Sequence, residues 1–229
     1  SRLRDPRSRS EILDYRLTPS FTYSIGRSTL GLEGHYRRYK EKIPDITTVQ
    51  TDPNMKYYTM TGMENANGVV GGYNGYMREY VNHEFGFRLS YAWQSPSWSS
   101  LTEAGVDRGS EGIYGIYKYQ PGHYHVYRYA VANKTTWRTS RWLHVVQARL
   151  QYEEGYADEY RQQLTITTDS ATSYNTYQYV NQMTYNKRYR VRLLDAALGY
   201  RLNSASEHGI NGYIGVDGAL RSVHNEYHL

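Results

Sequence analysis

Apolar and polar residues alternate almost without error between Glu84 and Gln94. One set of alternate positions holds only apolar and aromatic residues: Phe85, Phe87, Leu89, Tyr91 and Trp93. The other set is polar or small: Glu84, Gly86, Arg88, Ser90, Ala92 and Gln94. Successive side chains of a β-strand point to opposite faces of the sheet, so this period of two predicts a strand with one entirely apolar face.

A second alternating segment predicts a hairpin near the start of the chain. Apolar residues fall on every second position over residues 15–26, and the pattern resumes over residues 30–36. Gly26-Arg27 is the candidate for a tight turn between the two strands. Pro19 has no backbone N–H to donate to a ladder, so we expect the first strand at a sheet edge or at a bulge.

The rest of the chain extends the same architecture. Segments rich in Pro, Gly and Asn predict long loops at about 40–75 and 95–112, and a shorter loop is expected at 153–159. No stretch has helical periodicity, so residues 1–229 are interpreted as a single all-β domain of about nine antiparallel strands. The segment 174–202 is either one long strand or two strands with a turn at Asn186-Lys187. The other expected strands are 77–94, 113–119, 124–132, 135–152, a strand near 164–166, and 210–220, with a short strand near 57–60 inside the first long loop.

Composition favours a barrel of the outer-membrane type. Only 39% of the residues are hydrophobic, and Tyr supplies 27 residues whereas Phe supplies 3. The apolar ring and polar hydroxyl of Tyr suit boundaries between apolar and wet regions, including membrane interfaces. A barrel needs no apolar interior, because lipid covers its outside and its lumen is polar. No apolar run approaches the roughly 20 residues of a transmembrane helix, and the absence of Cys excludes a disulfide framework.

The fold hypothesis is therefore an antiparallel transmembrane β-barrel, or an incomplete portion of a larger one, with a lipid face and a lumen face. The alternative is a soluble or surface-exposed β-sandwich that binds glycans through aromatic loops and buries the apolar set between two sheets. In the barrel, the lipid-facing set is Phe85, Phe87, Leu89, Leu194, Leu198, Ile214 and Val216. The lumen-facing set is Glu84, Arg88, Asp195, Arg201 and Asp217.

Few residues suggest chemistry. His123 and His125 have a spacing that suits two metal ligands on one strand face. No third ligand is placed by the sequence, so two histidines on a wet face are the favoured interpretation. Arg188, Arg190 and Arg192 share a face; they either bind anionic groups or form a solvated basic row.

Aromatic residues near loops could stack on sugars, or belong to the aromatic girdles of a barrel: Tyr57, Tyr58, Trp93 and Trp98. No nucleophile elbow, phosphate-binding loop or dinucleotide-binding pattern is present, so the sequence predicts no enzyme, no catalytic residue, no cofactor and no metal site.

The net charge of +5 and the isoelectric point of about 9.1 do not indicate a nucleic-acid partner. Lys and Arg are interspersed with Asp and Glu instead of forming a polybasic tail. The expected surroundings are membrane lipid and lipopolysaccharide.

The alternation over 85–93, the hairpin over 15–36 and the segment Ala196-Ala-Leu-Gly-Tyr-Arg-Leu202 resemble outer-membrane β-barrels of Bacteroidota. The resemblance covers most of the chain and rests on these patterns. It implies an outer-membrane location and a porin-like or accessory role in nutrient uptake. The partners that it implies are a TonB-dependent transporter and surface lipoproteins.

Barrels of this type usually end in an aromatic residue on the last strand, whereas this sequence ends Asn225-Glu-Tyr-His-Leu229. An odd count near nine strands also departs from the usual even number. We therefore expect further strands before Ser1, after Leu229, or both.

Overall fold

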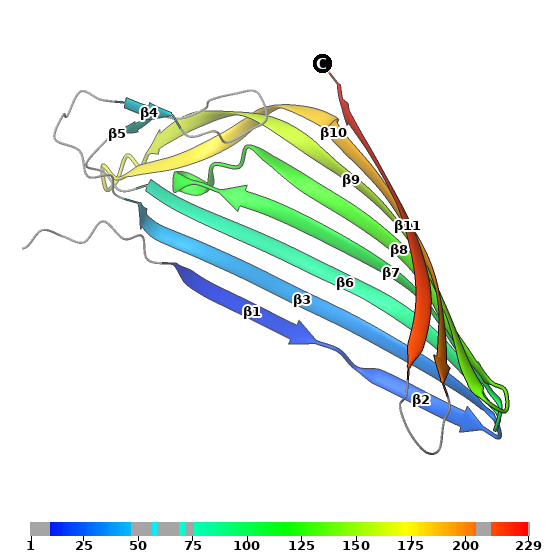
Figure 1. Ribbon diagram of the computed structural model, residues 1–229. Helices are drawn as coiled ribbons and strands as arrows, with labels where there is room; N and C mark the ends of the chain where they lie inside the picture. The colour runs from blue at the N-terminus through cyan, green and yellow to red at the C-terminus, as the bar shows by residue number, and fades with distance from the viewer. Residues whose placement is uncertain (1–9, 47–55, 59–68, 72–75, 205–211, 229) are drawn as a thin grey trace, which may run out of the picture.

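A strongly curved antiparallel sheet of nine strands makes up most of the protein (Figure 1). The computed structural model describes residues 10–46, 56–58, 69–71, 76–204 and 212–228, and these contain no α-helix. The strands of the sheet are β1 (Glu11–Leu17), β2 (Ser20–Ile25), β3 (Ser28–Ile46), β6 (Tyr76–Gln94), β7 (Trp98–Tyr114), β8 (Gly122–Arg138), β9 (Trp142–Thr168), β10 (Asn175–Ser204) and β11 (Tyr213–Tyr227). The expected all-β antiparallel class is confirmed.

Two smaller features complete the described part. The strands β4 (Lys56–Tyr58) and β5 (Val69–Gly71) pair as a separate two-stranded sheet. A 3-10 turn, η1 (Ile116–Lys118), lies between β7 and β8. Within the described residues, no helix has the length and apolar character needed to cross a membrane.

The sheet is an up-and-down meander with two open edges. Its order is β1-β3-β6-β7-β8-β9-β10-β11, and β2 also pairs with β3. The strands β1 and β2 thus share one edge and are separated at Thr18-Pro19, where the Pro19 carbonyl accepts the N–H of Gly34 at 2.9 Å. This confirms the predicted edge position of Pro19. The opposite edge is β11, which does not pair with β1 or β2 in the described sheet, so the sheet is not closed.

The connections differ between the two ends of the sheet. At one end the turns after β2, β6 and β8 comprise residues 26–27, 95–97 and 139–141. Gly26 adopts a positive φ of 58°, which confirms the predicted tight turn. At the other end, residues 47–75 connect β3 to β6, residues 115–121 connect β7 to β8, and β9 and β10 extend beyond β8.

The loop expected at 95–112 is wrong, because most of it forms β7. Pro96, Gly105 and Gly109 suggested a loop, yet both glycines lie within β7. A Cβ on Gly109 would lie 2.7 Å from a methyl carbon of Val126 on the neighbouring strand, so glycine is what this position requires. The loop expected at 40–75 is wrong at its start, because β3 continues to Ile46. Most of its remainder lies outside the described residues.

Other predicted boundaries also change. Residues 153–159 belong to β9, where Glu153 and Glu154 pair with arginines of neighbouring strands. Residues 135–152 contain the turn between β8 and β9, and 113–119 contains the end of β7 and η1. At Asn186-Lys187 the chain does not reverse, because the register shift between Tyr185 and Tyr189 is an irregularity within continuous β10. The strand predicted at 77–94 is confirmed as β6.

One face of the sheet carries an unbroken row of apolar side chains that crosses the strands from β2 to β11, with one residue from each strand. Cross-strand pairing aligns the eight residues Phe21, Leu32, Leu89, Ala104, Val131, Leu150, Ala196 and Leu220. Of these, Phe21 is 66% exposed, Leu89 62% and Leu220 63%. No second sheet of the described residues covers this apolar face.

The opposite face is polar and closely packed. Val126 lies on it and is the single buried hydrophobic side chain of the described residues, at 1% exposure. Its direct cross-strand partners are Gly109 and Gly155, which leave room for it between β7 and β9. Glycine at these positions lets the strands curve around the polar side without collisions between side chains. We call this the concave face and the apolar side the convex face.

Candidate functional site

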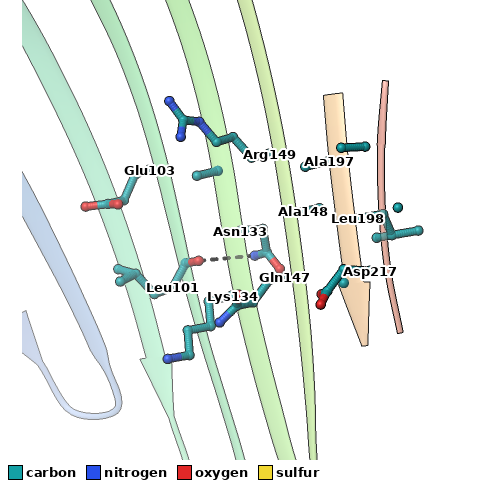
Figure 2. A pocket seen from close by; sticks show the side chains of 14 residues that line it. Leu101, Glu103, Asn133, Lys134, Gln147, Ala148, Arg149, Ala197, Leu198 and Asp217 are labelled. Atoms are coloured by element: carbon teal, nitrogen blue, oxygen red, sulfur yellow. Dashed lines mark hydrogen bonds between the residues drawn. The ribbon is translucent and has the colours of Figure 1, made fainter. Parts of the chain in front are cut away.

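A hollow of about 430 Å³ lies on the concave face, over β7 to β11 (Figure 2). Small residues on β8, β10 and β11 leave the space open: Ala132, Ala197, Gly199 and Ala219. Longer polar and charged side chains border it: Glu103, Lys134, Gln147, Arg149 and Asp217. The alternation of the strands brings these residues together, because each occupies a concave-face position in its own strand.

The side chains in Figure 2 follow this alternation. Glu103, Lys134 and Arg149 extend to the same side of the sheet, and Leu198 extends to the other side. Asn133, between Ala132 and Lys134, donates its amide N–H to the Leu101 carbonyl at 3.3 Å and to the Thr102 hydroxyl at 2.9 Å. These bonds satisfy an amide on the convex face and tie β8 to β7.

The charges around the hollow are not neutralised by one another. Glu103, Lys134, Arg149 and Asp217 form no ion pair with any described residue, although Arg149 donates a hydrogen bond to Gln151 at 2.6 Å. Two cations and two anions therefore face one space. A charged solute entering the hollow meets groups of both signs that form no ion pair within the described part of the chain.

Several charges elsewhere on the concave face are paired. Arg128 bridges Glu84 at 3.2 Å and Glu153 at 2.9 Å. The imidazole of His35 lies 3.1 Å from an Asp107 carboxylate oxygen. Such pairs tie adjacent strands together and leave less charge free for a ligand. The hollow is therefore the part of the concave face best suited to contact a solute.

The lining of the hollow is made of small, polar and charged side chains with a few apolar ones. No Ser, Thr, Cys, His or Tyr lines the described hollow. The carboxylates of Glu103 and Asp217, the ammonium group of Lys134 and the guanidinium of Arg149 supply its charged contacts.

The sequence anticipated part of this site. The predicted lumen-facing residues Glu84, Arg88, Asp195, Arg201 and Asp217 all lie on the concave face. The seven predicted lipid-facing residues lie on the convex face, and each is at least 36% exposed: Phe85, Phe87, Leu89, Leu194, Leu198, Ile214 and Val216. Glu103 was not predicted as a site residue, because residues 95–112 were expected to form a loop. Lys134 and Arg149 were not predicted either; the alternation of faces along β8 and β9 includes them, but polar residues on both faces obscure it.

The remaining candidates have structural surroundings. His123 and His125 lie together, with ring centroids 4.5 Å apart. No group of three His, Cys, Asp or Glu side chains suited to hold a metal ion occurs in the described residues.

Each of the three predicted arginines has a carboxylate partner. Arg188 contacts Glu159 at 3.0 Å, Arg190 is hydrogen-bonded to Glu154, and Arg192 lies 3.5 Å from Glu226. The basic row is thus largely neutralised by glutamates.

Aromatic residues gather at the short-turn end of the convex face. Trp98 stacks on Trp137 with ring centroids 5.7 Å apart, and Trp137 stacks on His144 at 4.8 Å. Trp93 lies on the same face of β6. The side chains of Tyr57 and Tyr58, in β4, lie outside the described residues.

The chain belongs to a protein family of unknown function, DUF6850, whose family model matches residues 1–229. No curated protein and no solved structure matches the chain.

Proposed function

We propose that this member of the DUF6850 family forms the wall of a transmembrane β-barrel in a Gram-negative outer membrane. In this role it bounds a polar passage and acts as a pore, or as an accessory subunit beside a larger transporter, in nutrient uptake. Membrane lipid and lipopolysaccharide surround it. A TonB-dependent transporter and surface lipoproteins are its proposed partners.

The apolar row of the convex face carries this proposal. On eight neighbouring strands, the residue in this row is Phe, Leu, Val or Ala and points to the convex side. No layer covers the row in the described part of the chain. Large contiguous apolar surfaces are rare on soluble monomers. A lipid phase removes this surface from water, and an outward apolar band is what spanning barrels present to lipid.

Aromatic residues lie on both sides of that row. Towards the long connections, Tyr129 and Tyr152 stack with centroids 6.4 Å apart. Towards the short turns lie Trp93, Trp98 and Trp137. From Phe85 to Trp93, β6 covers nine residues, which matches the 9–11 residues of a tilted spanning strand. Aromatic girdles at both interfaces are typical of such barrels.

The two ends of the sheet suggest an orientation. Outer-membrane barrels have short periplasmic turns and longer extracellular loops. By this rule the turns at 26–27, 95–97 and 139–141 face the periplasm. The extended β9–β10 arm and the strand ends at Ile46 and Tyr76 face the cell exterior.

Single cysteines offer a direct test, because the sequence contains no Cys. Leu89→Cys lies on the convex face and Ser90→Cys on the concave face of the same strand. In lipid vesicles, a membrane-impermeant maleimide should label Ser90→Cys and leave Leu89→Cys unreacted, since lipid shields it. Both should react after unfolding in urea.

Rapid labelling of Leu89→Cys in intact vesicles would contradict the proposal. That result would place the apolar face in water. The same pair of variants tests the sandwich alternative. In that fold the protein does not insert into the vesicles, so adding lipid changes the labelling of neither cysteine.

A further inference from the structure

A second group of charges lies on the convex face, just beyond the apolar row on the side of the long connections. Arg108 of β7 is two residues along the same face from Val106, and Tyr127 of β8 is directly opposite it. The guanidinium of Arg108 lies 5.7 Å from the centroid of the Tyr127 ring and 5.9 Å from that of Phe85. Both distances fit cation–π contacts.

A second cation meets the same aromatic surface from β10. The ammonium nitrogen of Lys187 lies 4.9 Å from the centroid of the Tyr156 ring. Tyr156 stacks on Tyr127, with centroids 6.4 Å apart and planes 22° from parallel. Arg108, Tyr127, Tyr156 and Lys187 therefore form one cation–tyrosine cluster, in which two cations flank a stacked pair of tyrosines.

The backbone of β10 places Lys187 in this cluster. Lys187 has a positive φ of 50° and lies in the register shift between Tyr185 and Tyr189. Irregularities of this kind redirect a side chain relative to its strand. The Lys187 N–H donates to a carboxylate oxygen of Asp158 at 2.7 Å, which holds the irregular segment against β9.

Neither cation has a carboxylate partner among the described residues. The adjacent carboxylate of Glu154 is engaged by Arg190. Asp158 accepts the backbone N–H of Lys187 and forms no ion pair with its ammonium group in the described structure. Both cations are exposed. The cluster therefore keeps two positive charges at the border of an apolar surface.

We propose that the cation–tyrosine cluster binds a phosphate group of lipid A, the phosphorylated lipid anchor of lipopolysaccharide. The inference rests on the proposed membrane function and its orientation, which place the cluster at the outer leaflet. Acyl chains lie against the apolar row while the phosphate meets Arg108 and Lys187. Arg binds phosphate through paired N–H groups, and Lys adds a point charge. The tyrosines hold both cations towards the lipid.

Native mass spectrometry of the full chain in detergent, with added lipid A, tests the proposal. Arg108→Gln/Lys187→Gln should bind lipid A about tenfold or more weakly than the unchanged protein, because two charge-assisted contacts are lost. Arg108→Lys/Lys187→Arg keeps both charges and should retain binding. Lys134→Gln/Arg149→Gln makes the same charge change on the concave face and should bind lipid A normally.

Three outcomes would overturn the inference. The first is unchanged binding by Arg108→Gln/Lys187→Gln. The second is equal binding of lipid A from which the phosphates have been removed. The third is complete displacement of lipid A by inorganic phosphate, which would assign the cluster to a soluble anion.

Cysteine labelling in vesicles of phosphatidylcholine, which carries no net charge, separates this inference from the proposed function. Shielding of Leu89→Cys together with unchanged lipid A binding by the double variant would overturn the inference alone. Labelling of Leu89→Cys would overturn both.

Discussion

Leu89 and Leu101 are the same residue type on opposite faces of the sheet. Leu89 lies in the middle of the apolar row and is 62% exposed, whereas Leu101 borders the concave hollow and is 39% exposed. From exposure to solvent alone, a charged substitution would be expected to cost less stability at Leu89 than at Leu101. The proposed membrane location reverses that order, because the exposed face meets lipid.

Leu89→Arg should lower the free energy of unfolding from vesicles by about 2–4 kcal/mol, the cost of an Arg at the bilayer midplane. Leu101→Arg should cost only about 1 kcal/mol, because its guanidinium reaches the polar hollow, where Glu103 offsets the like charge of Lys134 directly opposite. Urea unfolding of both variants in vesicles measures the difference. Equal costs, or a larger cost for Leu101→Arg, would contradict the assignment of the two faces.

Gly86 is required for close packing on the concave face. A Cβ at this position would lie 2.5 Å from the Val106 backbone oxygen and 2.7 Å from a ring carbon of His35. Gly86→Ala should therefore lower the free energy of unfolding by about 1–3 kcal/mol, as overpacking does elsewhere. Gly218→Ala is the matched control, since a Cβ there meets no atom within 4 Å. A Gly86→Ala variant as stable as the Gly218→Ala variant would show that the sheet relaxes locally.

The β9–β10 arm is stabilised by local contacts that extend past the rest of the sheet. Tyr117 stacks on Tyr177 with centroids 5.0 Å apart, and Tyr119 meets Tyr179 edge-on at 4.9 Å. At its tip, Asp169 accepts the N–H of Ala171 at 3.0 Å and the hydroxyl of Thr172 at 2.7 Å. The arm is thus organised by its own turn and by the β7–β8 connection.

The hydrogen bonds to Asp169 make the turn sensitive to pH. The Ala171 N–H, and then the Thr172 hydroxyl, lower the pKa of the Asp169 carboxyl below its ordinary value of 3.8. A lowered folded-state pKa means that the contribution to stability is present above pH 3.8 and is lost as the pH falls through the folded-state pKa. Hydrogen exchange of the Ala171 amide, corrected for its intrinsic pH dependence, should accelerate over that range. Asp169→Ala should show the faster exchange at all pH values; a pH response unchanged in Asp169→Ala would exclude the carboxyl as its origin.

At the scale of the whole molecule, strand alternation separates the two faces of the sheet, and curvature makes one of them convex and the other concave. The convex face gathers apolar side chains, and the concave face gathers the unpaired charges of the hollow. The sheet leaves two edges open, at β1–β2 and at β11. Unpaired backbone groups in lipid are costly, so in a membrane both edges require partner strands.

The charged side chains of the hollow predict ion selectivity for the proposed passage. Lys134→Glu/Arg149→Glu removes the two cations of the hollow and should shift the reversal potential in a planar bilayer towards cation preference. Arg38→Glu/Lys42→Glu makes the same charge change at convex-face positions and should shift it much less. An unchanged reversal potential in the first variant would place the conducting path away from the hollow.

The sequence by itself determined the class of the fold and the two faces of its clearest strands. A period of two reflects two unlike environments on the two faces of a strand. It is a local property, and residues 77–94 and the hairpin near Pro19 show it over a few neighbouring positions. The short turn at Gly26 and the edge position of Pro19 follow from the chemistry of single residues. These predictions required no knowledge of any distant contact.

The tertiary structure alone decided which glycine-rich and charged segments are strands, and what the concave face contains. Gly109 suggests a loop until Val126, from another strand, is placed against it. Glu153 suggests a solvated loop until Arg128 is found 2.9 Å away. The hollow joins Glu103, Lys134, Arg149 and Asp217 from four strands, and only the register brings them to one level. Register depends on pairing across the sheet, and local periodicity leaves it undetermined.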